Sequence, residues 1–152
     1  MQKLCFSRSL NWCLVGAFVL GLVSLASAVD KKTVKNNAGN CSISVPADWT
    51  VIASIGMANS ADKKMSAIVS SPKYGDMTFD HVRQMAPTVY PDDKVTKNTS
   101  SEFQMEGMSG NGKPNVYRAV PAGAKACIVE VQYDNEDAAG AMAIATSLAP
   151  AN

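Results

Sequence analysis

The side chains with the greatest chemical potential in this sequence are two cysteines and one histidine. Cys41 and Cys127 lie beyond the first 28 residues, and His81 is the single histidine of the chain. A zinc site needs three or four His, Cys or carboxylate ligands, and a serine or cysteine nucleophile needs a nearby base. His81 falls in the first turn of a predicted helix, where it is expected to be exposed. We therefore predict no catalytic residue, no cofactor and no metal site.

Methionine offers a second kind of chemistry, because thioethers bind Cu(I) in oxidising compartments. Residues 105–108 read MEGM, a Met-x-x-Met pair. However, residues three apart on a regular strand point to opposite faces, and several of the other methionines fall at core positions, where this side chain fills gaps well. A soft-metal or small-ligand carrier is kept as an alternative function, as is a hydrolase with an unrecognised site.

The first 28 residues have the composition of a cleavable secretion signal. Lys3 and Arg8 form a basic start, residues 12–26 are apolar, and Ala26-Ser27-Ala28 is the small-x-small pattern that signal peptidase accepts. A membrane-spanning helix is the alternative, but it needs about 20 apolar residues, and this run is shorter. We expect a periplasmic or secreted protein with no membrane span after signal cleavage.

The chain after residue 28 is close to electrically neutral. Cleavage removes two of the 14 basic residues, which leaves 12 against 13 acidic ones and a net charge of about −1. Without a basic surplus, neither nucleic acid nor anionic lipid is an expected partner. Residues 29–40 are polar and are predicted to be a flexible lead-in, and residues 41–149 are predicted to form a single domain.

The two cysteines fall on strands whose apolar residues alternate with polar ones. Cys41 shares a strand face with Ile43 and Val45, and Cys127 shares one with Val129 and Val131. Both thiols are expected to face inward in an oxidising compartment, so we predict a Cys41–Cys127 disulfide. The alternative is two buried free thiols.

The pattern along the domain predicts an α+β fold. Turn signals of hairpin length separate most of the strands, so the sheet should be largely antiparallel, with about six strands packed with two helices as a sandwich. The predicted strands are residues 41–45, 50–54, 65–71, 101–108, 115–120 and 126–133, and the predicted helices are residues 77–90 and 136–149.

The order of these elements and the motif SVPADWTV, residues 44–51, resemble the PsbP-like fold family. That family includes extrinsic subunits of photosystem II and small bacterial envelope proteins. The resemblance covers about residues 41–149, and it implies a scaffold that binds other proteins and shares no catalytic residues. It therefore favours a non-enzymatic, soluble envelope module that acts through protein–protein contacts.

A partner surface is expected where strand side chains point away from the core. If both helices pack on the apolar face of the sheet, the opposite positions form a flat, mildly acidic surface. Glu102, Glu106 and Glu130 then make the candidate partner face, together with the adjoining loops at 54–64 and 87–98. The expected partner is another envelope or secreted protein. Alternatively, these carboxylates only keep the domain soluble.

Overall fold

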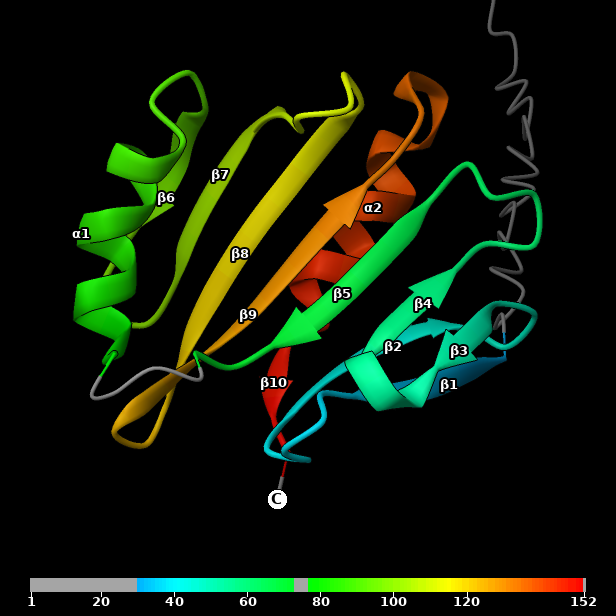
Figure 1. Cartoon of the computed structure of the whole chain (residues 1–152), viewed down its shortest axis with the longest axis horizontal. Helices are drawn as coiled ribbons and strands as arrows, with labels where there is room; N and C mark the ends of the chain where they lie inside the picture. Colours follow the sequence, from blue (N-terminus) through cyan, green and yellow to red (C-terminus); the bar gives the residue numbers. More distant parts are fainter. Residues whose placement is uncertain (1–29, 73–76, 152) are drawn as a thin grey trace, which may run out of the picture.

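The computed structural model describes residues 30–72 and 77–151. Within these ranges, seven strands form one antiparallel sheet in the order β3-β4-β5-β9-β8-β7-β6 (Figure 1). The α+β class and the antiparallel sheet predicted from the sequence are confirmed. The strands of this sheet are β3 Thr50–Ile52, β4 Met57–Asn59, β5 Ser66–Ser70, β6 Lys94–Asn98, β7 Phe103–Met108, β8 Pro114–Ala122 and β9 Lys125–Gln132.

The segment predicted to be a flexible lead-in instead begins a second, smaller sheet. β1 (Lys31–Lys35) pairs with β2 (Cys41–Pro46), and β2 also pairs with the short β10 (Ala149–Pro150). The prediction was wrong because a single apolar side chain anchors β1. Val34 is fully buried and lies opposite Ile43, whereas the rest of the strand is polar and gives no visible alternation. The predicted signal segment, residues 1–28, lies outside the described residues.

The two helices begin close to their predicted positions. α1 (Phe79–Val89) starts at Thr78, whose hydroxyl accepts a hydrogen bond of 3.2 Å from the His81 backbone N–H and caps the helix. Pro87 lies in the last turn, and the helix ends two residues later. α2 (Ala138–Thr146) follows a short 3-10 turn and is shorter than predicted, because Ala149 and Pro150 leave the helix to pair with β2. No helix in the described ranges is long and apolar enough to cross a membrane.

The helices lie on opposite faces of the large sheet (Figure 1). On β9, Val129 and Val131 belong to the core beneath α2, whereas Ala126 and Ile128 pack toward α1. The core on the α2 side also includes the small sheet, so it is the larger of the two. The core on the α1 side is centred on Phe103 and Met105 of β7, both fully buried.

Two segments predicted to be loops contain strands. Residues 54–64 include β4, and residues 87–98 include β6 after the end of α1. β4 was missed because it has only three residues, and its strand character comes from pairing with β3 on one side and β5 on the other. β6 was missed because every residue in it is exposed. Such polar composition is typical of an edge strand, where charge discourages pairing with other chains.

Candidate functional site

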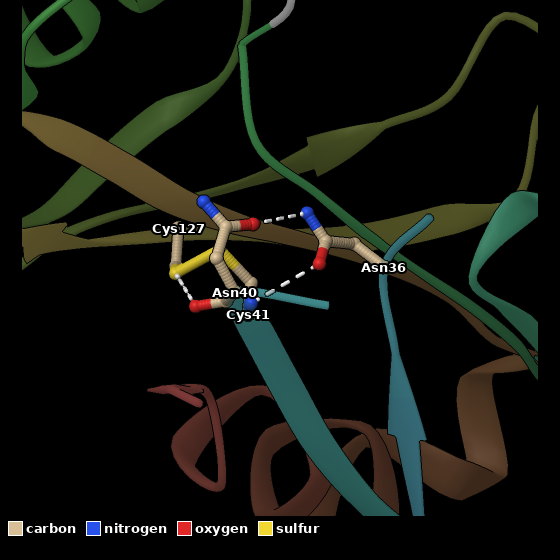
Figure 2. Close-up of a disulfide and its surroundings, with 4 residues drawn as sticks. All are labelled: Asn36, Asn40, Cys41 and Cys127. Atoms are coloured by element: carbon tan, nitrogen blue, oxygen red, sulfur yellow. Dashed lines mark hydrogen bonds between the residues drawn. A yellow bond between two sulfur atoms is a disulfide. The ribbon is translucent and has the colours of Figure 1, made fainter. Parts of the chain in front are cut away.

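The predicted disulfide joins the two sheets. Cys41 of β2 and Cys127 of β9 are bonded with an S–S distance of 2.04 Å, and both residues are fully buried (Figure 2). The turn before Cys41 is tied to the same place, since the Asn36 side chain accepts a 3.1 Å hydrogen bond from the Cys41 N–H and donates one of 2.8 Å to Asn40. The pairing is confirmed. Its position makes it a structural bond with no access for a substrate.

The predicted acidic partner face does not exist as one surface. Cross-strand partners share a face of a sheet, and the register pairs Glu130 with Tyr117, which in turn pairs with Met105. Glu130 therefore lies on the α1 side. Glu102 and Glu106 lie on the opposite, α2 side, because they alternate with the residues of β7 that pack toward α1.

The physical reason for this correction is that the apolar residues of neighbouring strands do not all point the same way. Phe103 and Met105 pack under α1, while Val129 and Val131 pack under α2. With a helix on each face, both sides of the sheet need apolar residues. The alternation within one strand cannot show which of the two cores its apolar residues enter.

Glu102 is part of an ion-pair network and not a free surface charge. Its carboxylate lies 2.5 Å from the Lys97 ammonium and 2.9 Å from the Arg118 guanidinium. Burial alone would raise the pKa of Glu102, but the neighbouring Lys97 and Arg118 cations outweigh it and lower the pKa below its ordinary value. Arg118 also donates a 2.8 Å hydrogen bond to the Ala145 carbonyl oxygen, so the network holds α2 on the sheet.

The other residues singled out for chemistry are dispersed. Met105 is fully buried under α1, whereas Met108 is 60% exposed at the end of β7 and lies on the other face, so the Met-x-x-Met pair cannot converge on one ion. His81 is exposed in the first turn of α1. In the part of the chain that the structure describes, no three His, Cys, Asp or Glu side chains gather closely enough to hold a metal ion.

A partly uncovered apolar surface lies instead on the α1 side of the sheet. α1 covers only part of this face, and β3, β4 and β5 extend beyond it (Figure 1). Ile52, Met57 and Ile68 lie in one row across these three strands, because the register places them side by side. Ile52 is 40% exposed and Ile68 is 42% exposed. We call this row, together with the adjoining groove described next, the open face.

The groove runs between α1 and the strands β5, β8 and β9, and has a volume of about 270 Å³. Met85, Val89 and Tyr90 come from α1 and the residue after it, and Tyr117 and Ile128 come from the sheet. All of these side chains have large apolar parts, and three of them, Met85, Val89 and Tyr90, are exposed. Ile68 adjoins the groove because its neighbour two residues along β5, Ser70, pairs with Ile128.

Glu130 is the charged group in this apolar surface. It lies between Ile68 and Tyr117 in the row across the sheet, and it accepts a 3.3 Å hydrogen bond from the Gln132 side chain. Burial, with a further contribution from the Glu130 charge, raises the pKa of both Tyr90 and Tyr117. Both phenols therefore stay neutral at physiological pH. Glu130 lies beside the groove, next to Tyr117.

The sequence carried a weak signal for this surface. Met85 and Val89 lie at helical spacing from Val82 and Ala86 in the sequence, but of the apolar residues of α1 only Phe79, Val82 and Ala86 are buried. When the apolar stripe of a helix is wider than its contact with the sheet, part of the stripe stays exposed. The width of that contact depends on the register of the sheet, which cannot be read from the sequence.

Comparison with known proteins identifies the fold. No protein-family model matches the sequence, and no curated protein sequence is similar to it. Among solved structures, the chain is similar to cyanobacterial PsbP (CyanoP) from Synechocystis sp. PCC 6803, with a TM-score of 0.50 and 10% sequence identity. The superposition covers 86% of this chain and 98% of that one. The fold is therefore PsbP-like, as the resemblance predicted.

Proposed function

We propose that this protein is a non-catalytic accessory protein of the cell envelope that binds another exported protein through its open face. The observation that carries the proposal is the row of partly exposed apolar residues on β3, β4 and β5, continuous with the groove beside α1. Contiguous exposed apolar surface of this kind typically marks a site of contact with another protein.

The chemistry of the open face indicates what the partner must present. Ile52, Ile68 and Val89 offer apolar contact area, and Tyr90 and Tyr117 add aromatic rings of the kind that anchor interfaces. Glu130 places one carboxylate inside this area. A complementary partner has an apolar segment with a lysine or arginine that meets Glu130, because opposite charges across an interface set its register.

An exported location supports this function. The disulfide between Cys41 and Cys127 is a bond typical of oxidising compartments, and the first 28 residues have the composition of a cleavable signal. The same location makes the partner an envelope or secreted protein. The PsbP-like fold fits a non-catalytic role, because the resemblance implies no shared catalytic residues.

Site-specific photo-crosslinking tests the proposal in cells. A photoreactive phenylalanine analogue replaces Ile68 on the open face or, as a matched control, Met108, an exposed apolar residue on the opposite face of the sheet. We expect a discrete adduct from position 68 and none from position 108. The crosslinked partner, identified by mass spectrometry, is then purified and titrated against the isolated protein.

A pair of charge reversals makes the test specific for the open face. Glu130→Lys should weaken the adduct from position 68 at least about fivefold, because it places two like charges together. Glu106→Lys makes the same charge change on the other face and should leave the adduct unchanged. Equal adducts from positions 68 and 108, or equal effects of the two reversals, would contradict the proposed site.

A further inference from the structure

A separate cavity lies on the α2 side of the large sheet, away from the open face. Its volume is about 490 Å³, within the range of small-molecule sites in proteins. Four segments line it: β1 at Lys31, the end of β2 with the turn that follows it, the turn between β4 and β5, and one side of α2 with the residue before it.

The sequence of α2 creates this space. Asp137, Gly140 and Ile144 follow a helical spacing of three and four residues, so they line one side of the helix, and Ala143 lies beside them. Two of these four positions carry a hydrogen or a methyl group only. A Cβ atom at Gly140 would already lie 3.2 Å from the Met65 Cε atom, so larger residues would fill the cavity.

The floor of the cavity is apolar and partly aromatic. Trp49, Met65 and Ile144 line it, and each has less than a tenth of its surface exposed. Such a floor accommodates an apolar body of a ligand. Tryptophan is also the aromatic residue that attracts cations most strongly, through the negative face of the indole ring.

Among the residues that line the cavity, carboxylates outnumber cations: Asp48, Asp62 and Asp137 come from three different segments, and Lys31 is the one cation among them. Two further lysines lie nearby, since the Ser60 hydrogen bond and, with it, the Lys64 charge lower the pKa of Asp62, and the Lys32 ammonium donates a hydrogen bond to the Trp49 carbonyl oxygen. The Asp62 carboxylate is held in place, since it accepts hydrogen bonds of 2.7 Å from the Ser60 hydroxyl and 3.1 Å from the Lys64 N–H.

We infer that this cavity binds a small amphipathic organic cation, with its apolar body on the Trp49 floor and its ammonium group among the carboxylates that line the cavity. The cation is a free amine or the side chain of a lysine from another protein, because both present the same ammonium chemistry. The inference goes beyond the proposed docking function, and the two sites can fail independently since they lie on opposite faces of the sheet.

Three probes of similar size separate charge from shape. Phenethylammonium, 2-phenylethanol and phenylacetate each carry a phenyl ring and are cationic, neutral and anionic. They are titrated by calorimetry and by fluorescence into protein made from the full-length coding sequence with Trp12→Phe, which leaves Trp49 as its tryptophan. We expect phenethylammonium to bind at least about tenfold more tightly than the other two, with a change in Trp49 emission.

Matched variants locate the binding. Asp48→Asn with Asp137→Asn leaves one carboxylate against Lys31, and should remove most of the preference for the cation. Asp80→Asn with Asp92→Asn removes the same charge from exposed positions that do not line the cavity, and should change nothing. Ala143→Phe fills the cavity and should abolish binding of all probes, whereas Ala139→Phe, on an exposed position of α2 that does not line the cavity, should not.

The outcomes decide the inference in either direction. Tighter binding of phenethylammonium than of acetyl-Gly-Lys-Gly-amide indicates a free amine as ligand, and the reverse order indicates a lysine side chain. The inference is overturned if no probe binds saturably at millimolar concentration, if phenylacetate binds as tightly as phenethylammonium, or if the Asp48/Asp137 variant keeps the full preference. Circular dichroism of each variant confirms that the fold is retained.

Discussion

The two faces of the seven-stranded sheet differ in how much of each is covered. On the α2 side, α2 and the small sheet pack over the centre, and the disulfide joins β2 to β9. On the α1 side, one helix covers the region of β7, β8 and β9, and Ile52 of β3 and Ile68 of β5 stay exposed. On both sides of the sheet, the side chains of each strand alternate between the two faces. The difference shows that the elements packed on each face, and not the alternation within the strands, determine which apolar side chains are buried and which stay exposed.

Removing the disulfide should produce the largest effect on the covered side. Cys41 and Cys127 are 86 residues apart in sequence, and a crosslink that closes a loop of this size stabilises by about 4–5 kcal/mol on the chain-entropy model. We expect the double variant Cys41→Ala, Cys127→Ala to lose free energy of unfolding on this scale, measured by urea denaturation. The reduced wild type should behave like the variant. A loss of unfolding free energy below about 1 kcal/mol would show that the disulfide contributes little to stability.

A pair of isoleucines compares the faces directly. Ile43 of β2 is buried in the core on the α2 side, whereas Ile68 of β5 lies on the open face. Ile43→Ala should cost about 2–4 kcal/mol through lost burial and the cavity left behind, while Ile68→Ala should cost less than about 1 kcal/mol. Thermal and urea unfolding of the two variants measure this. Similar losses would mean that the open face contributes to the fold as much as the covered one.

Gly107 tests the region of the α1 side that is covered. The Asp93 side chain rests on this glycine, and a Cβ atom built there would lie 1.7 Å from Asp93 Oδ1. Gly107→Ala should therefore cost about 1–3 kcal/mol, since either the side chain or the strand has to move. The matched double variant with Asp93→Ala should recover most of that loss. Strict additivity of the two single changes in unfolding free energy would show that they do not interact.

The smallest expected effect is the pH dependence of the Glu102 network. Because the Lys97 and Arg118 cations lower the pKa of Glu102 from its ordinary value of 4.5, its stabilising contribution is present above that pH and is lost as the pH falls through the lowered pKa. Glu102→Gln should reduce stability at pH 7 by up to about 1 kcal/mol. At pH 3 the difference from wild type should shrink, and a difference that is constant between pH 7 and pH 3 would exclude this role.

Some features of the molecule were readable from local sequence. The strand Cys41–Pro46 follows from the alternation of its side chains, and it ends at Pro46 because proline has no backbone N–H. The helix α1 starts after Thr78 because the Thr78 hydroxyl caps it. These are interactions within a few residues, so the pattern of those residues determines them. The disulfide was also predictable, because the chain beyond residue 28 holds two cysteines and both lie at inward positions.

Non-local pairing decided the rest. β1 is a strand because Val34 meets the core and its backbone meets β2, and the polar residues around it give no sign of this. The face of each glutamate followed from register: period-two alternation relates residues within a strand, but hydrogen-bonded pairing with the next strand determines which face they share. That pairing placed Glu130 and Glu102 on opposite faces of the sheet and left Ile68 exposed where α1 does not reach, so the position of the candidate site was decided by tertiary structure.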